Sequence, residues 1–149
     1  AALSSDLIVA ERQARFGLPE ILFNLFPGMG AYSFLERKVG RRLTEELLSS
    51  GKIYSADDML ALGVIDVVAE QGAGAAEVAA LAKRQSRSRN GLAAIAAARR
   101  RVNGVDYEEL MDVVRLWVDA AMRLTSRDLK LMQRLVSRQN DIRTSASVH

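Results

Sequence analysis

The chain has 149 residues, of which 49% are hydrophobic and 26% are charged, and its formal net charge is +3. This composition is typical of one globular domain with a sizeable core, and it excludes disordered and collagen-like chains. There is no cysteine, which excludes disulfides, thiolate catalysis and cysteine zinc sites. The single histidine, His149, is the last residue, and we interpret it as a terminal or tag residue. Proton chemistry is therefore left to Asp, Glu, Lys or Tyr side chains.

The least charged stretch, residues 16–35, is interrupted by prolines and glycines, so the sequence predicts no membrane-spanning helix. No basic-then-apolar leader opens the chain, and we therefore expect a cytoplasmic location. The chain begins at Ala1 with an apolar, strand-like segment and no methionine. We expect from this that further sequence belongs before Ala1.

The first part of the chain predicts short strands and short helices in alternation. Two extended segments are expected, at 6–11 (DLIVAE) and 13–19 (QARFGLP). Pro19 is expected to open a short helix with Glu20 in its first turn, and Pro27 to end it. A turn at 28–30, a helix over 31–39, a break at Gly40 and a second helix up to Gly51 follow.

The segment YSADDMLALGVIDVVAE (54–70) is the clearest local pattern in the chain. Ser55 is a good N-cap and Asp58 follows three residues later, which predicts a capped helix. Gly63 is a helix stop, and the β-branched residues after it predict a strand. Strands and helices are therefore expected to be mixed up to about residue 72.

The second part of the chain predicts helices almost throughout. An alanine-rich segment from 75 to about 102 is expected to be helical, with an interruption near Asn90-Gly91. Asp106 is expected to cap the next helix and Ser126 the last one. We divide the chain into a mixed region (1–72), a helical region (73–142) and a loose tail (143–149), with polar residues dominating after Asn140.

Glu20 is the only charged residue between Phe16 and Leu35. One interpretation is a carboxylate that the dipole of a helix stabilises in the first turn. The other is an acid placed among apolar side chains, where burial raises its pKa and suits it to proton transfer near neutral pH. The residues around Glu20 leave both interpretations open.

Three further features each have a structural and a functional interpretation. Gly28-Met29-Gly30 is a plain turn or a phosphate cradle, and a turn is favoured because a bare GxG is weak evidence. Trp117 and the leucines of the last two helices are core residues or the lining of an acyl pocket. Seven basic residues between Lys83 and Arg101, with no acidic one, form a solvated face, a subunit contact, or a docking site for nucleic acid, coenzyme A phosphates or an acidic protein. No aromatic residue interrupts that run, which argues against stacking on single-stranded bases.

The segments FGLPEILFNLFPGMGA (16–31) and GKIYSADDMLALGVIDVV (51–68) together resemble the crotonase (enoyl-CoA hydratase/isomerase) superfamily, and the resemblance covers residues 1 to about 70. Within it, the first segment is most similar to synthases of diffusible signal factors, which are cis-2 unsaturated fatty acids. The resemblance implies an α/β (α+β) fold: the C-terminal part of a ββα spiral followed by a mainly helical region for the acyl pocket and oligomerisation. Met59, Ile65 and Ala31 depart from the usual superfamily residues, and Ala31 with the bulky Met29 suggests a reshaped pocket.

The same resemblance implies a mechanism. Glu20 would be one of two catalytic glutamates, and the other, with the N–H groups of the oxyanion hole, would fall before Ala1. The complete enzyme would dehydrate a 3-hydroxyacyl thioester on acyl carrier protein and then hydrolyse the thioester to a cis-2 unsaturated acid. We expect Met29, Trp117, Leu131 and Leu135 to line the acyl tunnel, with Gly28 and Gly30 also at the substrate.

The partners expected from the resemblance are an acyl thioester of coenzyme A or acyl carrier protein and other copies of the chain. The expected assembly is a homotrimer or a dimer of trimers, with a regulatory sensor protein as a further partner. We expect no separate cofactor, no metal, no nucleic acid and no membrane span. The basic run between Lys83 and Arg101 would meet an acidic carrier protein, although this is no motif of the superfamily.

Three alternatives remain at this point. The first is a general enoyl-CoA hydratase or isomerase, which would differ in its carrier and in releasing a thioester. The second is a basic helical module that binds nucleic acid or regulates a partner. The third is a catalytically inactive fragment that associates with other subunits.

Overall fold

The computed structural model describes residues 2–146 and the side chains up to residue 138. The strands are β1 (Val9–Glu11), β2 (Arg15–Gly17), β3 (Ile53–Ser55) and β4 (Val67–Ala69). The α-helices are α1 (Ala31–Val39), α2 (Arg41–Ser50), α3 (Ala56–Ala61), α4 (Gly74–Gln85), α5 (Arg89–Asn103), α6 (Tyr107–Ala121) and α7 (Ser126–Ala146). Three short 3₁₀ segments are η1 (Ala2–Ser4), η2 (Pro19–Phe23) and η3 (Ser86–Ser88). Mixed strand and helix content confirms the predicted α/β class.

The four strands form two small sheets. β1 pairs in parallel with β4, and β2 pairs antiparallel with β3, with Phe16 opposite Tyr54. The parallel pair is also held by a side chain, because Asp66 Oδ2 accepts the Ile8 N–H at 2.8 Å. Since β1 and β4 are parallel, the chain must cross over between them, and it does so through β2, α1, α2, β3 and α3.

The core lies between these sheets and helices α1 to α3. Leu35, Leu47 and Ile65 are nearly inaccessible to solvent, and Ala56 is fully buried. Burying a leucine of this kind contributes about 1.5–3 kcal/mol to folding. Every buried side chain among those described lies at or before Ala69. The region expected over residues 1–72 therefore builds the whole core.

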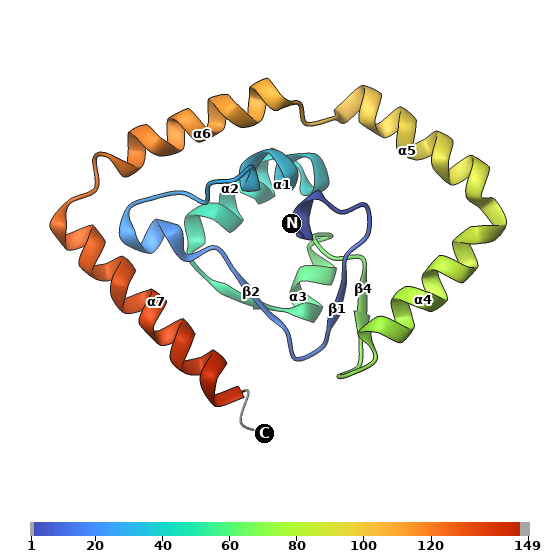
Figure 1. The fold of residues 1–149 in the computed structure, drawn as a ribbon, viewed down its shortest axis with the longest axis horizontal. Coiled ribbons are helices and arrows are strands. Elements are labelled where there is room, and N and C mark those ends of the chain that lie inside the picture. The colour runs from blue at the N-terminus through green and yellow to red at the C-terminus, as the bar shows by residue number, and fades with distance from the viewer. Residues whose placement is uncertain (1, 147–149) are drawn as a thin grey trace.

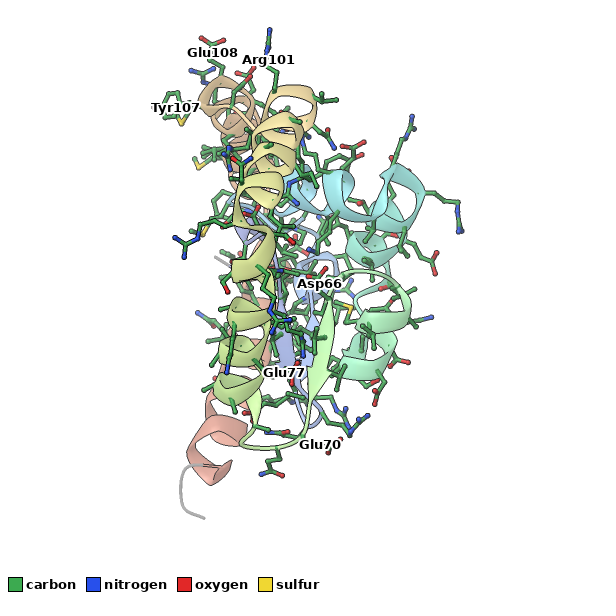
Figure 2. All side chains as sticks on the ribbon, turned by 90° about the vertical axis from the view of Figure 1, so that its right-hand side faces the viewer. Asp66, Glu70, Glu77, Arg101, Tyr107 and Glu108 are labelled. Atoms are coloured by element: carbon green, nitrogen blue, oxygen red, sulfur yellow. The ribbon has the colours of Figure 1, made fainter. Side chains whose placement is uncertain are left out.

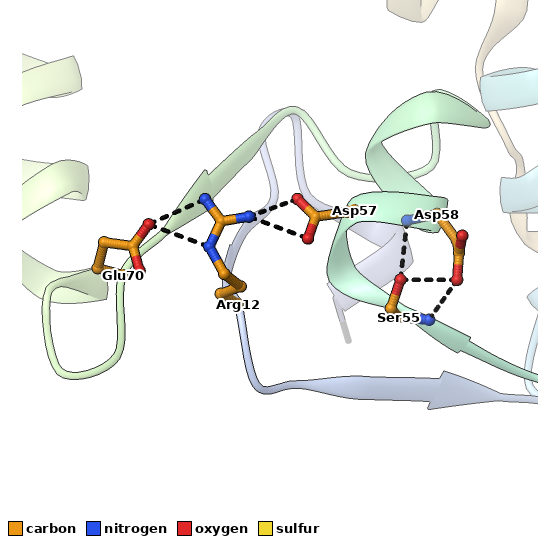
Figure 3. Close-up of polar contacts among 5 residues, drawn as sticks. All are labelled: Arg12, Ser55, Asp57, Asp58 and Glu70. Carbon is orange, nitrogen blue, oxygen red and sulfur yellow. Dashed lines mark hydrogen bonds and ion pairs between the residues drawn. The ribbon is translucent and has the colours of Figure 1, made fainter.

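Two groups of hydrogen bonds and ion pairs connect α3 to the strands around it, and Figure 3 shows both. Ser55 and Asp58 form the predicted capping box: Asp58 N–H donates to Ser55 Oγ at 3.1 Å, and Ser55 N–H donates to Asp58 Oδ2 at 2.9 Å. Arg12 links two carboxylates across the end of the parallel sheet. Its guanidinium donates to both oxygens of Asp57, at 2.7 and 2.9 Å, and to Glu70 Oε1 at 2.9 and 3.0 Å.

Helices α4 to α7 form an open frame around the core (Figure 1). In this view α4 and α5 border the right-hand side, α6 the top, and α7 the left. None of α4, α5 and α6 contains a buried residue. Within residues 2–146, no helix combines the length and the apolar character needed to cross a membrane.

The structure corrects several predicted boundaries. The turn around Glu20 is a 3₁₀ segment that ends at Phe23 rather than at Pro27. The alanine-rich helix is interrupted at Ser86–Ser88, not at Asn90-Gly91, because the glycine is tolerated inside α5. Thr125, not Ser126, caps α7: its hydroxyl accepts the Asp128 N–H at 3.3 Å. Helix α7 also continues past Asn140 to Ala146, whereas residues 147–149, with His149, lie outside the described residues.

Candidate active site

Glu20 lies on η2, a single 3₁₀ turn whose geometry follows from its sequence. Pro19 supplies the fixed φ of a first helical position and has no N–H to satisfy. At the other end Asn24 adopts φ 64°, a left-handed conformation that asparagine tolerates better than most residues. The Asn24 N–H donates to Ile21 O at 3.1 Å and the Leu25 N–H to Glu20 O at 3.0 Å, which closes the turn behind the glutamate.

The Glu20 carboxyl is half-buried and incompletely satisfied. Its Oε2 atom is inaccessible to solvent and has no hydrogen-bond partner among the described residues. Burial raises the pKa of this carboxyl, and the smaller opposing effect of its own backbone N–H does not cancel the shift. An oxygen in this setting favours the protonated acid or a partner that donates a hydrogen bond to it.

Two capping carboxylates of the same chain show what the other interpretation would look like. Hydrogen bonds from the Ser55 hydroxyl and backbone N–H lower the pKa of Asp58. Hydrogen bonds from the Thr125 N–H and hydroxyl lower the pKa of Asp128. The pKa of Glu20 is shifted in the opposite direction, and its Oε2 accepts no such bond. The structure therefore favours an acid in an apolar setting over a capping carboxylate.

Helix α7 covers η2 on one side, as the two lie together at the left of Figure 1. The half-buried positions of α7 are Asp128, Leu131, Met132 and Leu135. They repeat at helical spacing, so they form one face of the helix, and this is the face that packs toward η2. Leu131 and Leu135 thus lie on the side of α7 that faces the turn carrying Glu20.

Helix α6 covers the Gly28–Gly30 turn that follows η2. A Cβ atom on Gly28 would lie 3.0 Å from the Trp117 indole, and one on Gly30 would lie 2.7 Å from Leu110 Cδ2. Gly30 also has a positive φ of 78° at the N-cap of α1. Close approach of α6 and a left-handed turn therefore account for both glycines, which favours the turn interpretation over a phosphate cradle. Any contact of Gly28 or Gly30 with a substrate stays a prediction.

Met29 lies apart from the other residues expected in the acyl tunnel. It has a positive φ of 56° and its side chain is 94% exposed. Trp117, Leu131 and Leu135 are each half-buried around η2 and the glycine turn. Trp117 lies against Gly28, and Leu131 and Leu135 lie on the helix that packs on η2, whereas the Met29 side chain extends into solvent. A tunnel lined by these residues stays a prediction.

A separate apolar cavity of about 140 Å³ lies in the core. Its walls include Phe16 and Leu18 from the segment leading to η2, and Tyr54 from β3. None of the residues expected in the acyl tunnel lines it. No periodic pattern in the sequence predicts this cavity, because its lining comes from segments far apart in the chain.

The remaining candidate residues lie elsewhere. The basic run between Lys83 and Arg101 is on α4, η3 and α5, across the molecule from η2 (Figure 1). It is therefore not the part of this chain that presents a thioester to Glu20 of the same copy. No group of three or more His, Cys, Asp and Glu side chains suited to a metal occurs among the described residues.

These features define an α/β protein in which the half-buried Glu20 carboxyl has a raised pKa and its Oε2 atom has no hydrogen-bond partner among the described residues. The family model described as enoyl-CoA hydratase/isomerase matches residues 1–103, and the chain belongs to this family. Its similarity to known hydratases confirms the crotonase-like fold expected from the sequence.

Two curated relatives are similar over the first part of the chain. The mevalonyl-coenzyme A hydratase SIDH of Beauveria bassiana is 39% identical over 71 residues, which are 48% of this chain and 25% of the relative. A short-chain-enoyl-CoA hydratase of Clostridioides difficile is 34% identical over 82 residues, 55% of this chain and 53% of the relative. The crystal structure of a carnitinyl-CoA hydratase from Mycobacterium avium is 29% identical with a TM-score of 0.68, covering 87% of this chain and 50% of the other. The chain thus spans between a quarter and about half of these relatives.

Proposed function

We propose that this chain contributes Glu20 to an acyl-thioester active site that dehydrates a 3-hydroxyacyl thioester to an enoyl thioester. The observation that carries the proposal is the Glu20 carboxyl: its buried Oε2 has no hydrogen-bond partner in the part of the chain that the structure describes, and burial raises its pKa. Such a carboxyl holds its proton to a higher pH than an exposed glutamate does, and it can exchange that proton with a substrate carbon or hydroxyl. The apolar surroundings suit an acyl chain better than a polar substrate.

The finer proposal is a synthase of a cis-2 unsaturated fatty acid signal, with acyl carrier protein as the carrier and hydrolysis of the thioester as a second step. Support comes from the apolar group around η2: Trp117 against Gly28, and Leu131 and Leu135 on the inner face of α7. These side chains would hold the acyl chain while Glu20 moves the proton. Met29, at the rim of the same turn, would contact the chain where it enters.

A general enoyl-CoA hydratase or isomerase is the second candidate. It is favoured by the two hydratase relatives, which are 39% and 34% identical to this chain. In that case the carrier is coenzyme A and the product stays a thioester. The two candidates share Glu20 and differ in the carrier and in the released product.

The remaining expectations also belong to this proposal. The carrier's own thioester would supply the activated carbonyl, so no separate cofactor is proposed. The second glutamate and the oxyanion-hole N–H groups would come from sequence before Ala1. Assembly into trimers or dimers of trimers, and contact with a sensor protein, are proposed from the superfamily resemblance alone.

The test uses a preparation that includes whatever sequence precedes Ala1. A medium-chain 3-hydroxyacyl thioester is offered on acyl carrier protein and, separately, on coenzyme A, and the products are identified by mass spectrometry. Release of a free unsaturated acid that is lost in Glu20→Gln supports the signal synthase. An enoyl thioester as the only product supports the general hydratase. Turnover that survives Glu20→Gln contradicts both.

A further inference from the structure

A hollow of about 330 Å³ lies between the core-forming part of the chain and the end of helix α5. Its walls come from η1 and the residues after it, from α1, from Asp66 before β4, and from α5 with the loop that follows. Neither Glu20 nor any residue expected in the acyl tunnel lines it. Sites for small molecules have volumes of about 300–1,000 Å³, so this hollow is large enough for a small ligand.

The lining of this hollow is predominantly positive. Four cationic and two anionic side chains line it, which gives a net charge of +2. The cations are Arg37, Lys38, Arg99 and Arg100, and the anions are Asp6 and Asp66.

Both acids are already paired with cations of the same lining. Lys38 Nζ lies 3.4 Å from Asp66 Oδ2, and Asp66 Oδ2 also accepts the Ile8 N–H at 2.8 Å. Asp6 pairs with Arg99. These two pairs leave Arg37 and Arg100 as the cations that no acid of the lining neutralises.

Only one of these two cations is neutralised from outside the lining. Arg37 Nη2 lies 2.5 Å from Glu109 Oε2, an acid that does not line the hollow. Arg100 forms no ion pair with any side chain that the structure describes, and its side chain is exposed. The hollow therefore contains one positive charge, on Arg100, without a counter-charge in the described part of the chain.

The residues around Arg100 suit a planar anion. Asn103 follows Arg100 by three residues, so the two lie on the same side of α5, and both line the hollow. A guanidinium presents its N–H donors in a fork that matches the two oxygens of a carboxylate. The amide of Asn103 offers two further donors.

An apolar wall faces the same space. Leu3, Phe34 and Val105 line the hollow, and each is half-buried rather than buried. Their accessible apolar surface would be covered by a hydrocarbon group but not by an inorganic anion. One uncompensated charge likewise matches a carboxylate better than a phosphate monoester, which carries about 1.5 to 2 negative charges at pH 7.

We propose that this hollow is a binding site for a small carboxylate with an apolar body. The carboxylate lies on Arg100 and Asn103, and the hydrocarbon lies against Leu3, Phe34 and Val105. The proposal rests on no part of the acyl-thioester chemistry, because Glu20 is outside the hollow.

A ligand in this position would connect α5 to the core-forming part. Helix α5 contains no buried residue. At this end the chain holds it through the Arg99–Asp6 pair and through Arg37, whose Nη2 donates to Gly104 O at 3.5 Å. A ligand that touches α1 and α5 together would make local opening of α5 rarer, which slows the exchange of its amide hydrogens.

The experiment uses a preparation that includes whatever sequence precedes Ala1. Isothermal titration calorimetry measures the binding of hexanoate, hexanamide and inorganic phosphate. We expect a Kd of about 1 mM or lower for hexanoate. Hexanamide has the same body without the charge, and phosphate has the charge without the body, so we expect each to bind at least about 10-fold more weakly.

Two neighbouring arginines provide the matched variants. Arg100→Gln removes the cation of the hollow and should weaken hexanoate at least about 10-fold. Arg101→Gln is the control, because Arg101 does not line the hollow and points away from the body of the molecule in Figure 2. Both side chains are exposed, so neither change should unfold the protein, and Arg101→Gln should alter the Kd by less than about twofold.

Hydrogen exchange followed by mass spectrometry locates the bound hexanoate. We expect slower exchange in peptides that cover 96–105 in the original protein and in Arg101→Gln, and no change there in Arg100→Gln. Glu20→Gln should bind hexanoate with an unchanged Kd. A failure of the catalytic proposal would therefore leave this result intact.

Four outcomes overturn the proposal. Hexanoate gives no binding up to about 10 mM. Phosphate or hexanamide binds as tightly as hexanoate. Arg101→Gln weakens binding as much as Arg100→Gln does. Protection occurs around η2 and persists in Arg100→Gln, which places the probe in the proposed acyl pocket instead.

Discussion

The residues up to Ala69 and the helices from Gly74 onward differ in how much of their side-chain surface is buried. The first part contains every buried side chain that the structure describes, with Leu35 at 1% and Ala56 at 0% exposure. The helices α4, α5 and α6 contain none. One part is therefore held by cooperative packing, and the other by helix propensity, caps and a few points of contact.

The points of contact are where the frame meets the proposed active site. Helix α6 touches the glycine turn through Trp117 and Leu110, and α7 packs on η2. Glu20 thus lies on a turn that both α2 of the compact part and α7 of the frame contact. The comparison predicts that the chemistry depends on a single residue of the first part, while the second part shapes the pocket.

The largest expected effect is on activity. In the preparation that includes sequence before Ala1, Glu20→Gln should lower the turnover by about 10²- to 10⁴-fold, since the amide cannot transfer a proton. Glu46→Gln, a change of the same chemistry on the exposed side of α2, is the matched control and should change the rate by less than about twofold. Steady-state kinetics on both variants makes the comparison, and equal rates would remove Glu20 from the mechanism.

A pair of alanine substitutions compares the stability of the two parts. Leu35→Ala should destabilise the chain by about 2–5 kcal/mol, because it leaves a cavity in the core. Ile95→Ala on α5, where the side chain is 64% exposed, should change stability by less than about 0.5 kcal/mol. Urea denaturation followed by circular dichroism measures both. Similar losses for the two variants would mean that α5 is packed after all.

A pair of glycine substitutions tests the contact between the two parts. Gly30 and Gly63 both have positive φ, 78° and 74°, so alanine at either should cost about 1–2 kcal/mol. Only at Gly30 would the new Cβ meet Leu110, at 2.7 Å, whereas nothing lies within 4 Å at Gly63. We expect Gly30→Ala to be the more destabilising of the two by about 1 kcal/mol. Equal losses in thermal denaturation would show that α6 does not press on the turn.

Local sequence patterns were sufficient to predict most of the elements. The capping box of Ser55 and Asp58 and the cap at Asp106 each depend on residues three positions apart, so the chain shows them directly. Gly40 and Gly51 ended helices as expected. The misplaced break in the alanine-rich helix has a local cause too: Gly91 is an interior glycine that α5 accommodates, and the serines at 86 and 88 mark the 3₁₀ turn instead.

The surroundings of Glu20 could be predicted only in part. The lone charge in an apolar run indicated an acid in an apolar setting, and the raised pKa agrees with it. Trp117 packs close to Gly28, which lies 89 positions earlier in the chain, and no local sequence pattern predicts such a contact. The exposure of the Met29 side chain could not be predicted either, because no local pattern indicates that this residue adopts a positive φ.

A smaller effect is expected at the surface of the compact part. Arg12→Ala removes the bridge between Asp57 and Glu70, and we expect only a small loss of stability because all three side chains are half exposed or more and water screens their charges. Arg12→Lys keeps the charge without the two-pronged geometry and should recover less than half of that loss. Thermal denaturation at low and high salt measures the effect. A loss as large as that of Leu35→Ala would mean that the bridge holds β4 in place.

The smallest effect concerns pH, and its sign follows from burial. The pKa of Glu20 in the folded chain lies above its ordinary value of 4.5, so the folded state holds the proton to higher pH than the unfolded state. Below about pH 4.5 Glu20 is protonated in both states, and its charge does not lower the free energy of unfolding. As the pH rises through the folded pKa the carboxyl ionises, and the free energy of unfolding falls. Glu20→Gln carries no such charge. We expect its melting temperature, relative to the original chain, to rise by on the order of one or two degrees between pH 4 and pH 7. A difference that is constant with pH, or that falls, would show that the carboxyl is stabilised when ionised and is held by a donor outside the described residues.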